Sequence, residues 1–469
     1  METTHGKKVL IIGAGLGGLS CAHSLLAAGV DVTVCETASR AGGVVSSIER
    51  NGFRFETGPH TVLPSALTFR TICDELGIAD QLIPSSDRAK TRYLWYQGKL
   101  QPLPQHPLKL LRSPLLSARA KLHILREPLR RRAPHPEDAP EPSLGEFLTE
   151  RIGEEPAQRL AGAFVRGIYA GDVNALGARS AFPRLWKMVE EHGSILRGIK
   201  HKARAAREAP PMPGPAVPRG KLLSLPEGLG GFTGALADRI GRRLRTKATV
   251  EFLTRSGSRW SAKLVGGENL HVDEVVLAVP ARAARALLLP SAPPPALELL
   301  GTVPHARLTV CHLGFAPISP QDTPEGFGYL VPPTETGPEV PRVLGTIFAS
   351  NLFDGRAPSG GFSVASFYRS DDVDPSDPEH TTRIAVDELS RSLGWKETPP
   401  LVAREILSWK DVIPQYTIGH NERMARLEQI LSESAPGVHV AASYIGGVSV
   451  EDVLARGRSV AGRIAGASA

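Results

Sequence analysis

The sequence predicts an α/β protein in which a Rossmann-like parallel sheet is joined to a strand-rich region and a helical region. Three observations support this. The 469-residue chain is too long for one ordinary core. Its first forty residues follow the order strand, glycine turn, helix, strand, and its last thirty read as strand, glycine turn and helix. We therefore expect both ends of the chain to assemble the Rossmann-like domain, with the other regions inserted between them.

The composition is that of a globular protein, with 41% hydrophobic and 22% charged residues. The four cysteines are scattered without a C-x-x-C pair, which argues against a zinc site or a disulfide framework and fits a reducing compartment. A short polar lead runs straight into the first strand, so we expect no secretory signal. No apolar run reaches the ~18 residues that a membrane-spanning helix needs.

Residues 8–36 carry the most specific local pattern. A buried strand leads into Gly13, Gly15 and Gly18 in G-x-G-x-x-G spacing, followed by an amphipathic helix to about residue 28 and a second strand. Gly13 allows a tight turn, Gly15 lets a pyrophosphate approach the backbone, and Gly18 lets helix and strand pack closely. The helix N-terminus offers N–H groups to phosphates. Glu36 is placed to accept hydrogen bonds from ribose hydroxyls.

The rest of the chain alternates helical and strand-rich stretches. Apolar periodicity predicts a helix over 65–83, a hairpin over 92–104 with its turn at Gln97-Gly98, and mostly helices over 108–205. Proline excludes regular structure from 209–219. Residues 305–370 are strand-rich. A helix is expected near 380–394, and another closes the chain.

The net charge of +7 is uneven, because residues 99–135 hold nine Lys/Arg and one acid, Glu127. Such a segment suits an anionic membrane, an acidic substrate or a solvated face. Nucleic acid is the weakest reading, since no helix-turn-helix, zinc finger or aromatic RNA-binding signature accompanies it. The mixture of Leu/Ile with Lys/Arg favours an interfacial element.

Several motifs together resemble a known family. After Glu36, the R-x-G-G of Arg40 to Gly43 resembles the flavin-binding start of the amine-oxidase superfamily. Further along, "RGIYAGD" and "IPQYTIGH", with the segments 90–104, 325–333 and 441–458, resemble protoporphyrinogen oxidases. That family includes bacterial coproporphyrinogen-oxidising enzymes, and the resemblance runs almost end to end.

The resemblance implies a three-domain organisation. An FAD-binding domain of the amine-oxidase/p-hydroxybenzoate-hydroxylase type would comprise residues 1–62, 222–290 and 405–469. A substrate-binding domain with an antiparallel sheet would comprise 63–92 and 291–404. Residues 93–205 would form a helical, basic, membrane-binding domain, and 206–221 a mobile Pro-rich loop.

The resemblance also implies the site residues. Non-covalent FAD would be held by Gly13, Ala14, Gly15, Gly18, Glu36, Arg40, Ala41, Gly42, Gly58, Pro59, His60, Val250, Trp409, Val448, Ser449 and Val450. Substrate would be held by Arg92, which pairs with a propionate, Gly167, Phe327 and Leu330. Each position has a plainer interpretation: Arg92 as a surface residue, Phe327, Leu330 and Trp409 as core, and His60 as the end of a turn. Phe53 and Phe55 are expected in the core. The turn at 444–448 has one residue more than many family members.

The implied reaction is the oxygen-dependent six-electron oxidation of protoporphyrinogen IX to protoporphyrin IX in haem biosynthesis, with hydride passing to flavin N5 and hydrogen peroxide released. No catalytic side chain or metal site is expected, since the cofactor does the chemistry. Alternatives are coproporphyrinogen III oxidation, another FAD-dependent amine oxidase or desaturase, and a Rossmann-type binding protein without catalysis. The expected partners are a tetrapyrrole, oxygen, a membrane surface and a second copy in a homodimer, but not nucleic acid. The expected location is cytoplasmic, on the inner face of the cell membrane.

Overall fold

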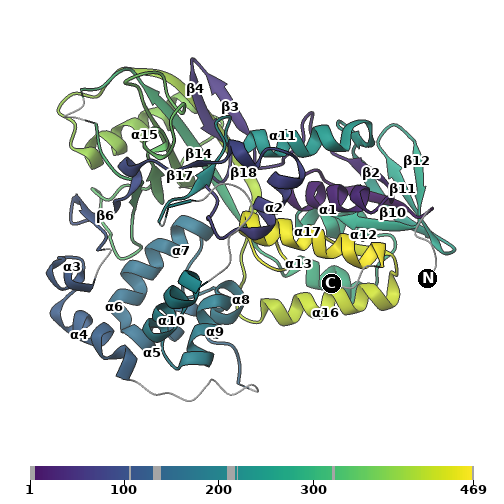
Figure 1. Cartoon of the computed structure of the whole chain (residues 1–469), viewed down its shortest axis with the longest axis horizontal. Coiled ribbons are helices and arrows are strands. Elements are labelled where there is room, and N and C mark those ends of the chain that lie inside the picture. The colour runs from purple at the N-terminus through teal and green to yellow at the C-terminus, as the bar shows by residue number, and fades with distance from the viewer. Residues whose placement is uncertain are drawn as a thin grey trace.

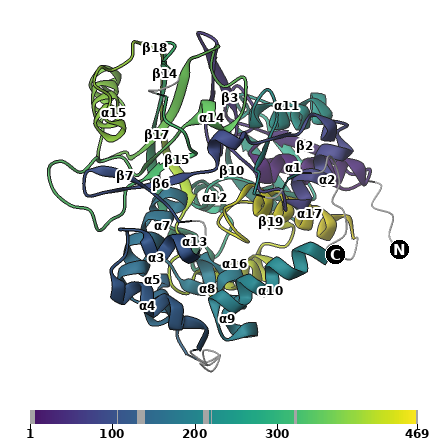
Figure 2. The same cartoon turned by 60° about the vertical axis from the view of Figure 1, so that its left-hand side comes forward.

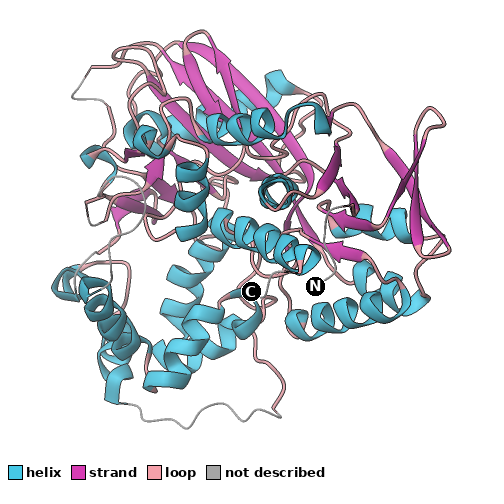
Figure 3. Ribbon diagram, turned by 45° about the vertical axis from the view of Figure 1, so that its right-hand side comes forward, coloured by secondary structure: helices cyan, strands magenta, loops and turns pink. Residues whose placement is uncertain are grey.

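The structure, a computed structural model, describes residues 6–104, 107–129, 139–208, 217–218, 220–319 and 323–466. These residues form three parts (Figure 1): a Rossmann-like part, a large sheet and a helical part. The Rossmann-like part lies on the right of this view, the large sheet at the upper left and the helical part below it. Figure 3 separates the strand-rich upper region from the helices beneath it.

The Rossmann-like part is built on a five-stranded parallel sheet in the order β19-β13-β1-β2-β9. Its strands are β1 (Lys8–Ile12), β2 (Asp31–Cys35), β9 (Leu244–Arg245), β13 (Glu274–Leu277) and β19 (Val438–Val440). One face is covered by α1 (Leu16–Ala27), α2 (Leu67–Glu75), α11 (Leu229–Ile240) and α17 (Val450–Ala465). Because both faces are buried, its strands are almost continuously apolar.

The other face of this sheet packs against a second layer. That layer contains the small antiparallel sheet of β10 (Val250–Ser256), β11 (Arg259–Leu264) and β12 (Asn269–Val272), with α12 (Ala281–Leu288), α13 (Pro294–Gly301) and α16 (His420–Ser434). The predicted assembly from both ends of the chain is confirmed, because β19 pairs with β13 and α17 packs along α1. The expected helix over 65–83 is shorter than predicted, since it ends before Gly77, which has φ +71°.

The large sheet has seven strands in the order β18-β14-β17-β16-β15-β6-β7. They are β6 (Arg92–Tyr96), β7 (Lys99–Pro102), β14 (His305–Phe315), β15 (Gly328–Leu330), β16 (Gly345–Ile347), β17 (Phe362–Arg369) and β18 (Leu401–Pro414). The predicted hairpin at Gln97-Gly98 is confirmed, with both turn residues at positive φ. The expected antiparallel sheet is wrong in one respect: β6 and β15 pair in parallel, so the sheet is mixed. No short turn joins these strands, so nothing in the chain forces them antiparallel.

The two faces of the large sheet have different neighbours. Its outer face packs Cys311, Leu313 and Tyr368 against α15 (Pro378–Leu393). Its inner face, which carries His312, Phe367 and Leu330 by strand alternation, is turned toward the Rossmann-like and helical parts. The His312 ring lies 5.1 Å from the Phe55 ring, between centroids, which fixes this orientation.

The helical part lies under β6, β7 and β15 (Figure 2). Its helices are α3 (Pro107–Arg112), α4 (Ala118–Arg126), α5 (Leu144–Ile152), α6 (Glu154–Pro156), α7 (Gly162–Tyr169), α8 (Ala178–Ala181), α9 (Pro183–His192) and α10 (Ile195–Glu208). Ser143 and Glu146 form a capping box that starts α5. A π-helical turn, Ala157–Ala161, leads into α7. Within the described residues, no helix is both long and apolar enough to cross a membrane.

Three expected domain boundaries shift. The boundary at residue 93 falls inside β6, and the one at 405 inside β18, because both strands belong to the large sheet. Residues 294–301, expected on the substrate side, pack into the Rossmann-like core as α13. Pairing partners lie hundreds of residues away, so local patterns cannot place these limits. In the predicted Pro-rich loop, residues 209–216 and 219 lie outside the described residues, and α10 continues to Glu208.

Four short strands and one helix complete the fold. β3 (Ser47–Arg50) pairs with β4 (Phe53–Glu56), and β5 (Ile83–Pro84) pairs with β8 (Leu223–Ser224). The helix is α14 (Ala349–Leu352).

Candidate functional site

The glycine loop between β1 and α1 has the geometry that its spacing predicts. Gly13 has φ +100°, its N–H donates to Cys35 O at 2.8 Å, and a Cβ here would lie 2.5 Å from Ala278 O. A Cβ at Gly18 would lie 2.0 Å from Gly13 O, so only glycine permits this helix–strand contact. At Gly15 a Cβ would meet no atom within 4 Å, and no side chain caps α1. The uncapped N–H groups of this helix start fit a pyrophosphate.

A second loop, residues 40–43, lies directly beside the glycine loop. The N–H of Gly42 donates to Ala14 O at 2.8 Å, and a Cβ at Gly43 would lie 3.3 Å from the Gly15 Cα. Arg40 is exposed and its Nη1 donates to Ala41 O at 3.2 Å, while no carboxylate of the described residues forms an ion pair with it. Partial burial lowers the pKa of the Arg40 guanidinium, and the nearby Glu36 carboxylate opposes this shift. An unpaired guanidinium here suits a phosphate.

The carboxylate of Glu36 organises the same region. Its Oε2 accepts the Ala14 N–H at 2.7 Å and its Oε1 accepts the Ala38 N–H at 2.8 Å. Each carboxylate oxygen retains a further lone pair, so Glu36 can hold its loop and accept a ribose hydroxyl. The two loops, the helix start, Glu36 and Arg40 thus fit one extended dinucleotide. This is the observation that supports FAD at these residues.

The turn at 57–60 is tied to both neighbours. The Trp409 Nε1 donates to Thr57 O at 3.1 Å, and Thr57 Oγ1 donates to Val44 O at 2.8 Å. A Cβ at Gly58 would lie 2.4 Å from Val44 O, so the glycine is required by the adjacent loop itself. Phe53 and Phe55 are buried in the core, as predicted. Trp409, half-buried on β18, therefore supports the Gly58-Pro59 turn from the large sheet.

His60 is buried at the end of this turn, and neither ring nitrogen has a hydrogen-bond partner among the described residues. Its ring lies 5.9 Å from that of Phe367 and 6.3 Å from that of His312. Burial, aided by Arg356, lowers the pKa of His60 to about 4; burial and His60 lower the pKa of His312 to about 3. Both imidazoles are therefore neutral near pH 7. Buried polar atoms usually have partners, so His60 has bonding capacity that a bound group can use.

The remaining predicted cofactor residues lie at the borders of the parts. Val250 begins β10, on the far side of the parallel sheet. Val448 packs against the helical core and Val450 against the Rossmann-like core, with the exposed Ser449 between them as the N-cap of α17. In the longer turn before them, Gly447 has φ +127° and its N–H donates to the Tyr416 hydroxyl at 2.8 Å. The extra residue is thus accommodated by a glycine conformation and a side-chain tether.

The predicted substrate residues form two contacting pairs where α7 and the large sheet meet. The Arg92 guanidinium lies over the Phe327 ring at 5.0 Å, and a Cβ at Gly167 would lie 2.5 Å from the Leu330 Cδ2. Phe327 and Leu330 are half-buried rather than fully in the core. Arg92 is exposed without an ion pair to any described carboxylate, and partial desolvation lowers its pKa. Arg92 and Leu330 lie on the inner face.

Helix α7 supplies an apolar wall beside these pairs. Phe164 and Ile168, which are 50% and 41% exposed, lie on the same side of α7 as Gly167 by i, i+3, i+4 spacing. The π-helical turn Ala157–Ala161 precedes this helix, and such turns often occur at functional sites. The exposed wall, Leu330 and Arg92 together suit a flat apolar molecule with a carboxylate at one edge.

One important pair was missed from the sequence. Glu56, in the strand before the turn, lies 3.4 Å from Arg356, and each side chain is 2% exposed. Arg356 also donates to Pro226 O, Ser224 Oγ and Leu225 O. Burial raises the pKa of Glu56 to about 7 although Arg356 opposes the shift. The alternating pattern in the sequence predicted that Phe53 and Phe55 are buried, but it could not predict that Glu56 pairs with Arg356, 300 residues away.

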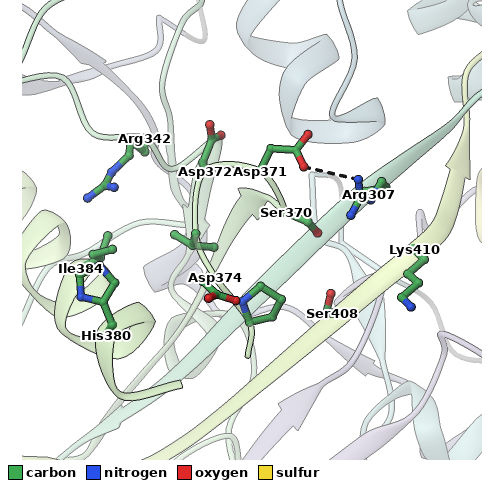
Figure 4. A pocket seen from close by; sticks show the side chains of 12 residues that line it. Arg307, Arg342, Ser370, Asp371, Asp372, Asp374, His380, Ile384, Ser408 and Lys410 are labelled. Carbon is green, nitrogen blue, oxygen red and sulfur yellow. Dashed lines mark ion pairs between the residues drawn. The ribbon is translucent and has the colours of Figure 1, made fainter. Parts of the chain in front are cut away.

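A separate cavity of about 500 Å³ lies beyond the outer face (Figure 4). Arg307, Asp371 and Lys410 line it, and Arg307 pairs with Asp371 at 3.5 Å. Its wall includes Ser408, which is on the opposite face of β18 from Trp409. This charged cavity is therefore distinct from the surface of Arg92 and Leu330.

Comparisons with known proteins agree with this geometry. The family model described as flavin containing amine oxidoreductase matches residues 16–465. Protoporphyrinogen oxidase 2 of Arabidopsis thaliana is 28% identical, with 97% of this chain and 93% of the relative covered. Coproporphyrinogen III oxidase of Propionibacterium freudenreichii subsp. freudenreichii is 30% identical, with 97% and 90% covered.

Solved structures show the same fold. An Exiguobacterium sp. 255-15 crystal structure, provisionally assigned as a protoporphyrinogen oxidase, has a TM-score of 0.81 at 22% identity and covers 98% of this chain and 99% of its own. Cyclohexylamine oxidase from Brevibacterium oxydans IH-35A has a TM-score of 0.69 at 17% identity, with 98% and 99% covered. Because the family match spans nearly all of the described fold, the chain belongs to the flavin containing amine oxidoreductase family and is an FAD-dependent oxidoreductase.

Proposed function

We propose that this protein oxidises a porphyrinogen to a porphyrin in haem biosynthesis, with oxygen as the final electron acceptor. The observation that carries the proposal is the inner-face surface formed by Arg92, Phe327, Leu330 and Gly167, an apolar area with an unpaired guanidinium at its edge. Two groups of relatives support it, since both protoporphyrinogen and coproporphyrinogen III oxidases align along the whole chain.

The chemistry balances without a catalytic side chain. A porphyrinogen loses six electrons and six protons in three steps, and three molecules of oxygen become three of hydrogen peroxide. A flavin held by the Rossmann-like part would supply the hydride acceptor and the route of electrons to oxygen. The protein positions the substrate: Arg92 binds a propionate, and Leu330, Phe327 and the α7 wall exclude water from the ring. Neutral His60 adds no charge beside the cofactor.

In this proposal the Rossmann-like part holds FAD through the predicted residues and the large sheet holds substrate. Protoporphyrinogen IX, which the resemblance implies, is one candidate substrate. Coproporphyrinogen III is the second, because the relative with 30% identity carries that name.

An absorption spectrum and an oxygen-uptake assay test the proposal. Purified protein should show flavin bands that trichloroacetic acid releases into the supernatant, as expected for non-covalent FAD. Oxygen should be consumed with protoporphyrinogen IX or coproporphyrinogen III, but not with putrescine. Uptake with putrescine alone would assign the chain to the amine oxidases, and an absence of flavin would favour a binding protein without catalysis.

We further propose that the helical part docks on a membrane, at the inner face of the cell membrane. Leu122, Leu125 and Leu129 are 43%, 50% and 78% exposed, and they alternate with basic residues of the 99–135 segment. Ile199 on α10 is 51% exposed among further lysines and arginines. Apolar side chains ringed by cations suit an anionic interface. Sedimentation with anionic liposomes at low salt, and its loss in L125S/L129S, would support docking; failure of the native protein to sediment would refute it.

A further inference from the structure

Two arginines face the candidate substrate surface from the side opposite Arg92. Arg166, on α7 next to Gly167, is half-buried; its Nη1 donates to Val331 O at 3.3 Å and its buried Nε has no partner. Arg369 ends β17 two residues after Phe367, so strand alternation places it on the inner face. The two charges are close enough that Arg369 lowers the pKa of Arg166, after desolvation.

Neither arginine is neutralised by the residues around it. In the part of the chain that the structure describes, no carboxylate lies within 4 Å of either guanidinium. The nearest acid acting on Arg166 is Asp372, which raises its pKa. Asp372, however, lines the cavity beyond the outer face (Figure 4). A partly desolvated guanidinium such as that of Arg166, with a buried Nε that lacks a partner, is costly unless an anion binds it.

The strand register gives the distance between this pair and Arg92. Arg92 pairs with Gly328, Gly328 with Ile347, and Ile347 with Ala365 on β17. Arg92 and Ala365 are therefore three strand spacings, or roughly 14 Å, apart across the sheet. Arg369 lies four residues beyond Ala365, about 13 Å along β17. The Cα atoms of Arg92 and Arg369 are thus roughly 20 Å apart on a diagonal.

The row between these two corners is apolar. It consists of Leu94, Leu330, Gly345 and Phe367, and Gly167 meets it at Leu330. A Cβ at Gly345 would lie 2.7 Å from the Leu330 Cδ2, so glycine keeps this row flat. Leu94 and Gly345 are buried, so the accessible part of this row is Leu330 and Phe367, and guanidinium groups lie at its opposite corners.

We propose that Arg166 and Arg369 form a second carboxylate-binding site, which makes a tetracarboxylate porphyrinogen with carboxylates on opposite edges the preferred substrate. This inference rests on the proposed porphyrinogen oxidation and names its substrate. A dicarboxylate such as protoporphyrinogen IX has its carboxylates along one edge and fills only the Arg92 end. Coproporphyrinogen III carries propionates where protoporphyrinogen has vinyl groups, so it can fill both ends.

The test compares two stable porphyrins as ligands of the FAD-loaded protein. Binding of coproporphyrin III and protoporphyrin IX is followed by the shift of the porphyrin absorption band. R369Q should weaken coproporphyrin III binding about tenfold and change protoporphyrin IX binding less than twofold, because one charged hydrogen-bonded contact is lost. R166Q should act in the same direction, and R369K should retain most of the affinity.

The matched control is R307Q, since Arg307 is a surface arginine paired with Asp371 at the outer cavity. It should leave both affinities unchanged. The proposed second carboxylate site would be refuted if R369Q weakened the binding of both porphyrins equally, or weakened the binding of neither. Because Arg369 is exposed, R369Q decides the matter even if R166Q does not fold.

Oxygen uptake separates this inference from the function on which it rests. With R369Q, KM for coproporphyrinogen III should rise about tenfold while kcat and the protoporphyrinogen IX kinetics stay within twofold. If native protein retains flavin but oxidises neither porphyrinogen, the proposed function fails. If it oxidises both equally well and R369Q does not discriminate, only the second carboxylate site fails.

Discussion

At the residue scale, His60 and His312 show how burial sets charge. Their rings lie 6.3 Å apart between the 57–60 turn and β14, and burial keeps both neutral. The pKa of such a histidine is lower in the native state than in the unfolded state. At a pH between these two values, the native state therefore binds fewer protons than the unfolded state. Its contribution to stability is therefore present above pH 6.5 and is lost as the pH falls toward 4.

The variant His60→Leu tests this directly, because leucine is similar in size and cannot be protonated. Lowering the pH from 7 to 5 should destabilise the variant by about 1–2 kcal/mol less than the native protein. Urea midpoints at the two pH values measure the difference. The control is His271→Gln, which replaces a histidine at an exposed position on β12; an equal change in both variants would contradict the burial argument.

Arg92 tests the substrate end of the site. Arg92→Ala should raise KM for porphyrinogen about tenfold or more, because a charged hydrogen bond to a propionate is lost, while FAD content per protein stays constant. Lys99→Ala, an exposed cation on the adjacent strand β7, is the control and should change neither quantity. Loss of FAD from the Arg92 variant would show that the residue is structural.

At the element scale, α1 and α17 pack backbone to backbone. A Cβ at Gly457 of α17 would lie 2.5 Å from Gly17 O of α1. A Cβ at Gly17 would also lie 2.0 Å from the O atom of Ala441, just after β19. The Ser20 hydroxyl donates to Leu454 O at 2.8 Å across the same contact. Both helices start at predicted cofactor residues, so their separation sets the distance between the pyrophosphate loop and residues 448–450.

Gly457→Ala should therefore cost about 1–3 kcal/mol of unfolding free energy, since the clash involves backbone that cannot turn away. It should also lower FAD content, because the helix starts move apart. Thermal unfolding and flavin-to-protein absorbance ratios report the two effects. Gly234→Ala, where α11 has open space, should be neutral or slightly stabilising. Equal effects in the two variants would mean that helix propensity rather than packing dominates.

Features that lie within one short stretch of sequence could be predicted, whereas contacts between distant elements could not. Gly13, Gly18 and Glu36 were identifiable because their roles follow from short spacings along one strand–turn–helix unit. The hairpin at Gln97-Gly98 was local as well. The parallel pairing of β6 with β15 was not local, since Arg92 and its partner Gly328 are 236 residues apart in the sequence. Arg166, Arg369 and His312 were missed for the same reason: only the register of the large sheet brings them to one face.

At the scale of the whole molecule, two ion pairs among the described residues link the β3–β4 hairpin to the region of the large sheet. Glu56–Arg356 is buried, with hydrogen bonds from Arg356 to residues 224–226. Arg50–Glu405 is exposed, with Nε 2.8 Å from the carboxylate. The buried Glu56–Arg356 pair holds β4, and with it the turn at 57–60, against the region of the large sheet. Loss of this ion pair should therefore lower the stability of the whole fold.

Arg356→Met should cost about 3–5 kcal/mol, because it removes the cation beside Glu56 and leaves the acceptors at residues 224–226 without the hydrogen bonds that Arg356 donates. Arg50→Met should cost at most about 1 kcal/mol, as for other exposed pairs. Chemical unfolding at pH 7 compares them, and similar values would contradict the role of burial. Glu56→Gln should cost less than Arg356→Met, because the pKa of Glu56 is already raised to about 7 and its neutral form is tolerated. The native protein gains stability from this carboxyl below pH 4.5 and loses it as the pH rises through 7.

The docking of β19 and α17 on β13 and α1 also bears on synthesis. A ribosome delivers residues 8–36 hundreds of codons before it delivers residues 438–465, so the nascent glycine loop waits without its neighbouring helix. The parallel sheet lacks its edge strand β19, and residues 448–450 lack their place beside α1, until residues 438–465 have been translated. Cofactor loading should therefore follow the synthesis of residues 438–465, and the emerging chain would depend on chaperones to shield its unfinished apolar faces.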